Sequence, residues 1–329
     1  MRLGVGRTLI TCLAVSAAAA CSDERQSVEV TVPPGAGLSQ VADSLSSRAV
    51  IRAPGLFQVY ARIRGDDHRI KAGRYEFQTG TSWGDALGRL TRGEVMTVPM
   101  TIPEGFQLSQ MVDRIAEVTG RPADAVATFL TSDEVAARYD LPGPTAEGYL
   151  FPDTYRFARG VDPGRVVDAM IGRYRAVWTA ERRSRADSLG MTEQEIITLA
   201  SIIQAEARKF EEMPLISGVY HHRLRIGWLL QADPTVLYAL GGTRERLLYA
   251  AIDSVAENPY NTYTQAGLPP GPIGAPGEAA IDAALNPVDD YLYFVAWPDG
   301  SHVFTRSLVE HNRAKADAQR AREAEALGN

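Results

Sequence analysis

The segment from Thr192 to Ala207 reads TEQEIITLASIIQAEA, and it predicts a buried helix that ends on a carboxylate. Thr192 and Glu195 are three residues apart, which is the spacing of a capping box, so a helix should begin here. Apolar residues then recur at helical spacing and form one stripe, which has to be buried against other elements. They are Ile196, Leu199, Ala200, Ile202 and Ile203. The chain is therefore expected to build a core around this segment.

Glu206 lies on the same stripe, seven residues after Leu199 and three after Ile203. A carboxyl group in apolar surroundings keeps its proton towards neutral pH, which is what a general acid needs. The alternative is a helix end at which the stripe has already opened to solvent. Ser201 precedes Glu206 by five residues, and we expect it to bond its own helix because no motif links a histidine base to it. Glu206 is the candidate catalytic residue.

With 329 residues, the chain is long enough for two domains, each with its own core. The composition is that of a globular protein, with 45% apolar and 22% charged residues. The formal net charge of −6 argues against a nucleic-acid partner, which would need a broad basic patch. The charge says little about neutral polymers such as glycans.

Residues 1–21 are expected to be a targeting segment outside the fold. Arg2 and Arg7 flank a short basic region, and an apolar run from about Thr8 to Ala20 follows. A transmembrane helix needs about 20 apolar residues, and this run is shorter. It therefore fits a secretory signal better than a transmembrane helix. Cys21, directly after small residues, also fits a lipoprotein anchor. We expect a lipoprotein or a retained inner-membrane anchor, and the alternative is a plain cleaved signal.

The two cysteines, Cys12 and Cys21, both fall in this leader. The remaining chain therefore forms no disulfide and has no thiol chemistry. This is compatible with a bacterial envelope protein.

Residues 28–97 have the pattern of a small α+β module. Period-2 alternation indicates strands, and apolar spacing of three and four indicates helices. The expected elements are a strand at 28–32, helices at 39–45 and 56–64, a strand at 71–78 and a helix at 81–90. The module should therefore have the order β-α-α-β-α.

Residues 104–329 are expected to form a larger, mainly helical α+β domain, preceded by a strand at 96–102. Helices are expected at 109–119, 122–130, 133–139 and 163–189, from Pro214 to just before Gly227, from Asp233 to the Gly241-Gly242 pair, at 278–285 and from Ser307 onwards. A hairpin is expected in which a turn of Pro, Asp and Gly joins a strand at 291–296 to a strand at 302–305. The long segment 257–277 is rich in Asn, Tyr, Pro and Gly, and its aromatics favour an ordered, functional loop.

Polar and aromatic residues gather in four places, of which Glu206 is one. The segment from Glu147 to Tyr155 holds three aromatic residues and two carboxylates. Aromatic rings suit the apolar faces of sugars, and a carboxylate such as Glu147 accepts hydrogen bonds from hydroxyl groups. The alternative is an amphipathic strand with core aromatics.

Two further segments carry side chains that could hold a polar ligand. The sequence LQADPT at 230–235 offers Gln231 and Asp233, although Asp233 could instead cap a helix. The Pro- and Gly-rich loop contains Asn261 and Tyr263 and then reads GLPPGPI at 267–273. Such a stiff loop presents amide groups at little cost in ordering.

Other kinds of site find no support. His221 and His222 are adjacent on a helix and do not share a face, so they make a poor metal pair. The phosphate-loop pattern Gly-x-x-x-x-Gly-Lys does not occur. The sequence GTSWG at 80–84 matches a nucleophile elbow, but its module is too small for the required sheet, so Thr81 or Ser82 should cap a helix. We expect no metal and no cofactor.

The order of these clusters resembles the endolytic murein transglycosylases, the MltG or YceG-like family. The matching segments are KAGRY at 71–75, EGYLFPDTY at 147–155, LASIIQAE at 199–206, HRLRIG at 222–227, LQADPTV at 230–236, YNTY at 260–263, GLPPGPI at 267–273, YLYFV at 291–295 and His311-Asn312. The resemblance covers the chain from about Val28 to the C-terminus. The combination of Gln-x-Asp-Pro-Thr, Tyr-Asn-Thr-Tyr and Gly-Leu-Pro-Pro-Gly is highly specific.

The resemblance implies an inner-membrane anchor or lipoprotein leader (1–21), a LysM-like glycan-binding module (28–97) and a periplasmic catalytic domain (104–329). Family catalysis is attributed to the second glutamate of a Glu-Lys-Glu motif, which corresponds to Glu206 here. The first glutamate of the motif is replaced by Gln204 in this chain.

The activity implied is endolytic cleavage of the β-1,4 bond between N-acetylmuramic acid (MurNAc) and N-acetylglucosamine (GlcNAc), with formation of 1,6-anhydro ends. The family also implies work beside glycan-polymerising synthases, ending nascent strands. Candidates for holding the sugar are Glu147, Gln231, Asp233, Asn261 and Tyr263. Two alternatives remain open, a non-catalytic glycan-binding scaffold and a lysozyme-like hydrolase that pairs Glu206 with Asp233.

Overall fold

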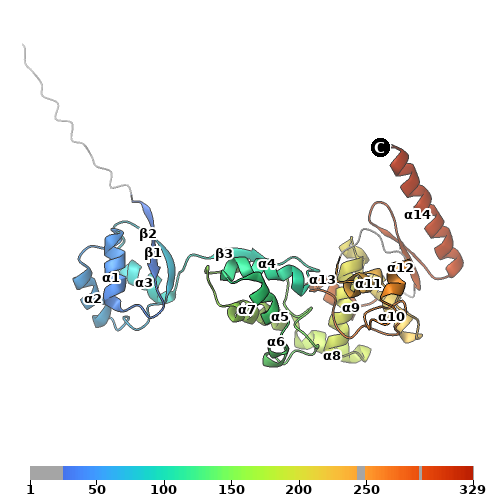
Figure 1. The fold of residues 1–329 in the computed structure, drawn as a ribbon, viewed down its shortest axis with the longest axis horizontal. Helices are drawn as coiled ribbons and strands as arrows, with labels where there is room; N and C mark the ends of the chain where they lie inside the picture. Colours follow the sequence, from blue (N-terminus) through green and yellow to red (C-terminus); the bar gives the residue numbers. More distant parts are fainter. Residues whose placement is uncertain (1–24, 243–248, 289–290, 329) are drawn as a thin grey trace, which may run out of the picture. The chain divides into compact units, whose positions relative to one another are not determined.

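The computed structural model describes residues 25–242, 249–288 and 291–328, which form an α+β fold of helices and short antiparallel strand pairs (Figure 1). The chain divides into two compact units between Met96 and Thr97. The predicted leader, 1–21, lies outside the described residues. Within those described ranges, no helix is both long enough and apolar enough to cross a membrane.

The first unit has the predicted order β-α-α-β-α. Its elements are β1 (Ser27–Val32), α1 (Leu38–Ser47), α2 (Pro54–Ile63), β2 (Gly73–Gln78) and α3 (Trp83–Arg92). The strands pair antiparallel with Val30 opposite Tyr75, and both side chains enter a core that the helices cover. Ser82 caps α3 by accepting a hydrogen bond of 3.2 Å from the amide of Asp85, so the prediction that a serine or threonine of GTSWG is a helix cap is confirmed.

The second unit begins with a helical layer on a strand pair. Its elements are β3 (Val98–Thr101), α4 (Leu108–Thr119), α5 (Ala123–Leu130), α6 (Asp133–Arg138), β4 (Thr154–Phe157) and α7 (Pro163–Val177). Strands β3 and β4 are antiparallel, with Met100 opposite Tyr155. Met111 and Ile115 on α4 pack with Met170 of α7 in a common core.

The predicted helix at 163–189 is wrong at its centre, because it is two helices, α7 and α8 (Ala180–Leu189). Trp178 leaves the helical conformation with ψ 72°. Thr179 then caps α8 by accepting a hydrogen bond of 3.3 Å from the amide of Arg182. The periodicity continues across the break, so the pattern of apolar residues did not reveal it.

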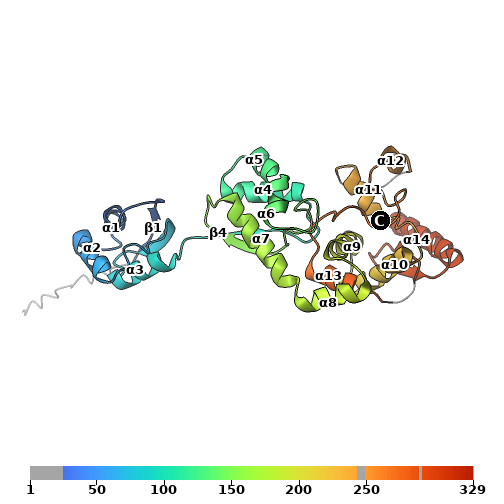
Figure 2. The ribbon, with the colours of Figure 1, turned by 90° about the horizontal axis from the view of Figure 1, so that it is seen from below.

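Helix α9 (Glu193–Glu206) lies at the centre of a second core, beside α8, α10 (Met213–Arg225), α11 (Asp233–Ala239) and α13 (Glu278–Leu285) (Figure 2). The predicted capping box of Thr192 and Glu195 is present. The predicted stripe is buried, but Ile197, Thr198 and Ser201 are buried too. Between Ile196 and Ile203 the helix is therefore buried on all sides rather than on one face.

The remaining elements of the described ranges follow the predicted order, with two additions. They are a 3₁₀ turn (Phe210–Glu212), α12 (Tyr249–Ser254), β5 (Tyr293–Ala296), β6 (His302–Thr305) and α14 (Leu308–Gly328), and the turn and α12 were not predicted. Strands β5 and β6 form the expected hairpin.

The loop between α12 and α13 is irregular but packed, since residues 271–277 are buried. Ser201 of α9 donates a hydrogen bond to its own helix, to Thr198 O at 2.7 Å, as predicted. Its oxygen also accepts one of 3.0 Å from the amide of Ile273, which fixes the loop on α9. The sequence GLPPGPI therefore lies against the helix that carries Glu206.

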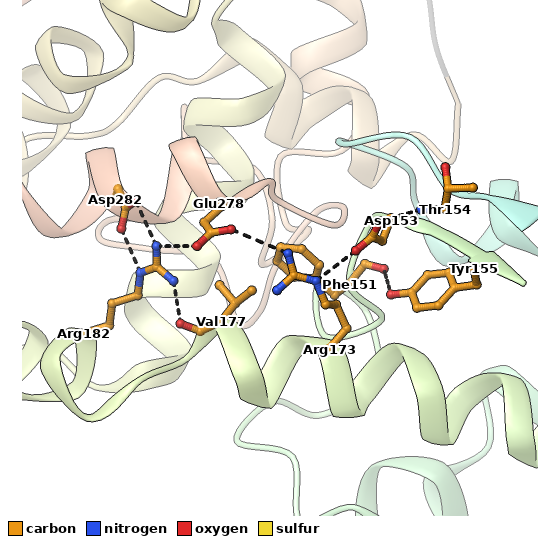
Figure 3. Close-up of polar contacts among 9 residues, drawn as sticks. All are labelled: Phe151, Asp153, Thr154, Tyr155, Arg173, Val177, Arg182, Glu278 and Asp282. Carbon is orange, nitrogen blue, oxygen red and sulfur yellow. Dashed lines mark hydrogen bonds and ion pairs between the residues drawn. The ribbon is translucent and has the colours of Figure 1, made fainter.

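An arginine network joins α8 to α13 (Figure 3). Arg182, whose side chain is 14% exposed, bonds Asp282 at 2.8 Å and Glu278 at 3.0 Å. Its third donor bonds Val177 O at 2.5 Å, at the end of α7.

Arg173 of α7 extends this network to the segment before β4 (Figure 3). It bonds Asp153 at 2.9 Å, lies 3.7 Å from Glu278, and places its guanidinium 5.1 Å from the Phe151 ring centroid. The two arginines thus tie α7, α8, α13 and the segment before β4 into one block.

Candidate active site

Glu206 is the last residue of α9, at the point where the buried helix reaches the surface. Its side chain is half-buried. The hydroxyl of Tyr220 donates a hydrogen bond of 2.9 Å to Oε1 of Glu206. Ala207 then adopts an extended conformation, so the chain leaves the helix directly after the carboxylate.

Burial is the main reason why the pKa of Glu206 is raised to about 7. The negative charge of Asp233 raises it further, while the Tyr220 hydroxyl and the Arg223 guanidinium act to lower the same pKa. The carboxyl group can therefore hold a proton near neutral pH and also exist as a carboxylate. A group balanced in this way can act first as an acid and then as a base.

Tyr220 and Arg223 lie three residues apart on α10, so they share the face that meets Glu206. Arg223 is 8% exposed and donates to Leu230 O at 2.5 Å and to Leu292 O at 2.9 Å. Burial lowers the pKa of Arg223, but arginine stays protonated in proteins. Neither residue was among those predicted for the site, although polar side chains at buried positions of a helix could have pointed to them.

Asp233 and Tyr263 lie beside Glu206, as the sequence analysis expected of a shared site. Asp233 is the first residue of α11, and it accepts a hydrogen bond from the Tyr263 hydroxyl. Burial raises the pKa of Tyr263, and the hydrogen bond to Asp233 acts in the same direction. The charge of Asp233 acts on the pKa of Glu206, so the three predicted residues form one electrostatic group.

Asn261 is also near this group, but its side chain is turned into the loop. It is fully buried, and its amide donates to Ile252 O at 3.0 Å and to Val255 O at 3.1 Å. Its carbonyl oxygen accepts a bond of 3.0 Å from the amide of Tyr263. Because both donors are already used, these contacts give Asn261 a role in positioning Tyr263 and do not support direct sugar binding.

Gln231 has an exposed side chain and lies two residues before the start of α11. Its φ of +50° lies in the left-handed region that non-glycine residues seldom occupy. The backbone amide of Gln231 donates a hydrogen bond of 3.0 Å to Thr262 O. This bond holds the conformation and pairs the two loop segments of the site. Gln231 therefore remains available to a ligand.

Glu147 lies outside the group formed by Glu206, Asp233 and Tyr263, and its carboxylate is used in hydrogen bonds within the fold. It is 5% exposed, and the first amide of α4, that of Leu108, donates to its two oxygens at 3.1 and 3.2 Å. Burial raises its pKa to about 7, against the opposing effects of that amide and of the Tyr238 hydroxyl at 3.4 Å. Glu147 thus caps α4 and reaches α11 through Tyr238.

Gln204, in the place of the first glutamate of the family motif, also has a structural contact. Its Oε1 accepts a hydrogen bond of 3.0 Å from the amide of Gly277, the residue before α13. In the described residues, no cluster of three or more His, Cys, Asp or Glu side chains is arranged to hold a metal ion.

The chain is similar to proteins of one known family. Residues 30–317 match the family model described as the YceG-like family. The chain is 33% identical, over 89% of its length and 85% of the relative's, to an endolytic murein transglycosylase of Bacillus subtilis. A Streptococcus pneumoniae protein of the same name is 28% identical over 90% of this chain, which spans 59% of that protein. A crystal structure of a YceG-like protein from Listeria monocytogenes matches with a TM-score of 0.61 and 30% identity, over 88% of this chain and 99% of that one.

Proposed function

The chain belongs to the YceG-like family, and from this premise we propose that it is a lytic transglycosylase of peptidoglycan. The relatives in B. subtilis and S. pneumoniae are named endolytic murein transglycosylases. The single observation that carries the activity to this chain is the half-buried Glu206, whose pKa burial raises to about 7. A carboxyl group of this kind can protonate a leaving group at neutral pH.

The first half of the reaction breaks the bond between C1 of MurNAc and O4 of GlcNAc. Protonated Glu206 donates its proton to O4, and the bonding electron pair leaves with that oxygen. GlcNAc departs with a free hydroxyl group, and positive charge develops at C1 and the ring oxygen of MurNAc. Glu206 is left as a carboxylate.

The second half of the reaction closes a ring within the same sugar. The Glu206 carboxylate accepts the proton of the C6 hydroxyl, and O6 forms a bond to C1. The product is a 1,6-anhydro end, Glu206 regains its proton, and no water is consumed. Because the nucleophile belongs to the substrate, most of the entropy cost of its approach is already removed. One carboxyl group is sufficient, whereas hydrolysis by a glycosidase requires two.

The side chains around Glu206 are suited to stabilise the charges that form during this reaction. The Tyr220 hydroxyl and the Arg223 guanidinium stabilise the carboxylate that exists between the two halves. Asp233, held by the Tyr263 hydroxyl, supplies a negative charge beside the positively charged sugar. Gln231 is exposed next to Asp233 and offers an amide to sugar hydroxyl groups.

The finer organisation of the chain forms part of the same proposal. Residues 1–21 would serve as an inner-membrane anchor or lipoprotein leader, and residues 28–97 as a LysM-like module that holds glycan. Residues 104–329 would then act as the catalytic domain in the periplasm. Mass spectrometry of the mature N-terminus tests the anchor, since an acylated Cys21 is the lipoprotein outcome.

The cellular role that fits endolytic cleavage is the ending of nascent glycan strands beside the glycan-polymerising synthases. Cutting within a strand while it is being polymerised would set its length. Deletion of the gene should then lengthen the glycan strands of the wall, and unchanged strand lengths would remove this role without removing the activity.

Product analysis tests the activity itself. The purified chain without its leader should release anhydro-ended fragments from peptidoglycan. Glu206→Gln should abolish release while the protein stays folded. Glu211→Gln is a matched control, because Glu211 is an exposed glutamate just after α9. This variant should cleave at the wild-type rate.

A second candidate function is that of a lysozyme-like hydrolase. The observation that favours it is that the charge of Asp233 acts on the pKa of Glu206, since a hydrolase needs two carboxyl groups in one site. Fragments that end in reducing MurNAc would identify the hydrolase. Glycan binding without any cleavage by the wild-type protein would instead identify a scaffold.

A further inference from the structure

The C-terminus of α10 positions an exposed tryptophan close to the candidate active site. The amide of Trp228 donates to Arg223 O at 2.8 Å, and the amide of Gly227 donates to Leu224 O at 3.2 Å. With Gly227 in the left-handed conformation at φ +70°, this is a Schellman cap. The cap gives Trp228 a defined backbone position at the end of the helix that carries Tyr220 and Arg223.

The Trp228 ring is both fixed and accessible. Its side chain is one of the large exposed hydrophobic groups, with 44% of the residue surface open to solvent. The ring of Tyr293 lies 6.0 Å away at an interplanar angle of 67°, an edge-to-face contact that restricts how the indole can turn. An indole held on one side and open on the other presents a rigid apolar surface.

Tyr293 is in turn held from two sides. It is the first residue of β5, and its ring stacks on that of His311 at a centroid distance of 5.0 Å. The guanidinium carbon of Arg223 lies 5.8 Å from the Tyr293 ring centroid. The aromatic pair is therefore supported by side chains from α14 and α10.

Arg223 joins this aromatic pair to the catalytic carboxylate. The same guanidinium bonds Leu230 O, two residues after Trp228, and Leu292 O, the residue before Tyr293. It also acts electrostatically on Glu206 and Tyr263. The pair is thus continuous with the site of cleavage through one buried side chain, and Gln231 and Asp233 follow Trp228 within five residues of chain.

We propose that Trp228, supported by Tyr293, is a stacking platform for a pyranose ring of the glycan strand beside the sugar that is cleaved. The inference rests on the proposed function and adds a substrate-positioning surface to it. The apolar face of a sugar ring covers an exposed indole, while its hydroxyl groups stay in reach of polar side chains such as Gln231. Trp228 acts by binding and takes no part in proton transfer.

The test measures glycan binding apart from turnover. Uncross-linked chains of alternating GlcNAc and MurNAc are titrated by calorimetry against the chain without its leader, in the Glu206→Gln background. Trp228→Ala should weaken binding about tenfold, as expected for the loss of one good stacking contact. Trp228→Phe should keep most of the affinity because it keeps a ring, and Tyr249→Ala, an 82% exposed aromatic on α12, should change nothing.

A second readout separates positioning from a structural role. In the active protein, Trp228→Ala should raise KM about tenfold and leave kcat within about twofold. If Trp228→Ala does not fold, Trp228→Leu replaces it as an apolar side chain without a ring. Unchanged binding in Trp228→Ala or Trp228→Leu overturns the platform, as does a loss of kcat with unchanged KM.

The platform and the proposed function can fail separately. A wild-type protein that makes anhydro ends, with a Trp228→Ala variant of equal affinity, removes the platform alone. A wild-type protein that binds glycan but leaves it uncut removes the proposed function, and the loss of affinity in Trp228→Ala then still decides the platform.

Discussion

The hydroxyl of Tyr220 donates a hydrogen bond of 2.9 Å to the carboxylate of Glu206, and the two residues come from different helices, α10 and α9. The bond favours the charged form of Glu206, whereas burial favours its neutral form. The pKa of about 7 is the balance between them. This contact sets how readily the proposed catalytic proton is given and taken back.

Tyr220→Phe should move the pH dependence of cleavage upwards. Because Glu206 has to carry a proton when the free enzyme meets its substrate, kcat/KM of the wild type should fall as the pH rises through about 7. Without the hydroxyl the charged form is less stable, so the pKa of Glu206 rises and the falling limb moves to higher pH. The measurement is kcat/KM on soluble glycan over a series of pH values.

Asp233→Asn should move the same limb in the opposite direction. The negative charge of Asp233 raises the pKa of Glu206, so its removal lowers that pKa and the limb moves to lower pH. The absolute rate should fall as well, because a negative charge beside the sugar is lost. Limbs that shift in one common direction in both variants would contradict the electrostatic account of the site.

Much of this site could be predicted from the sequence because its main helix obeys local rules. Thr192 and Glu195 indicate the start of α9, because they form a capping box that involves only residues close in sequence. Helical spacing then places Glu206 on the buried stripe. The partners Tyr220 and Arg223 could not be predicted in the same way, since their contacts depend on how α10 packs against α9.

Glu147→Gln should remove part of the pH dependence of stability. Folding raises the pKa of Glu147 from about 4.5 to about 7, so the folded state holds the proton more tightly and stability falls as the pH rises through this window. The loss is at most about 3 kcal/mol between about pH 5 and about pH 8. Glutamine cannot ionise, and its oxygen can still accept from the amide of Leu108.

The measurement for Glu147 is urea unfolding at several pH values. Glu206 has a pKa raised in the same direction and would contribute a similar slope, so the comparison is made in the Glu206→Gln background. The double variant should lose less stability on going from acid to neutral pH. Identical slopes in the two proteins would show that Glu147 does not titrate as described.

Arg182→Met should destabilise the second unit by about 2–4 kcal/mol, because it leaves Val177 O and two carboxylates without their shared donor. Arg165→Met is the matched control. Arg165 is 77% exposed and lies 4.0 Å from Asp168, so its loss should cost less than about 0.5 kcal/mol. Thermal and urea unfolding check both variants, and equal stabilities of Arg182→Met and the wild type would mean that the bonds of Arg182 in Figure 3 contribute nothing.

Several features of the structure could not be predicted from the local sequence, and the physical reason is the same in each case. Helical spacing continues through Trp178, yet the chain breaks there because Thr179 caps a new helix. Asn261 has the type of side chain that binds sugars, but the fold uses both its donors for backbone carbonyls. Glu147 likewise caps α4 across a gap of 39 residues in sequence. Local pattern identifies the residue types, and only tertiary packing decides which of their polar atoms remain free.

The fate of water in the reaction tests the central claim most directly. Peptidoglycan is digested by the purified chain in water labelled with the heavy oxygen isotope, and the new glycan ends are analysed by mass spectrometry. If Glu206 alone gives a proton to O4 and takes one from the C6 hydroxyl, the MurNAc ends are 1,6-anhydro and contain no label. Reducing MurNAc ends that carry the label at C1 would contradict the account, because a water molecule would then be the nucleophile.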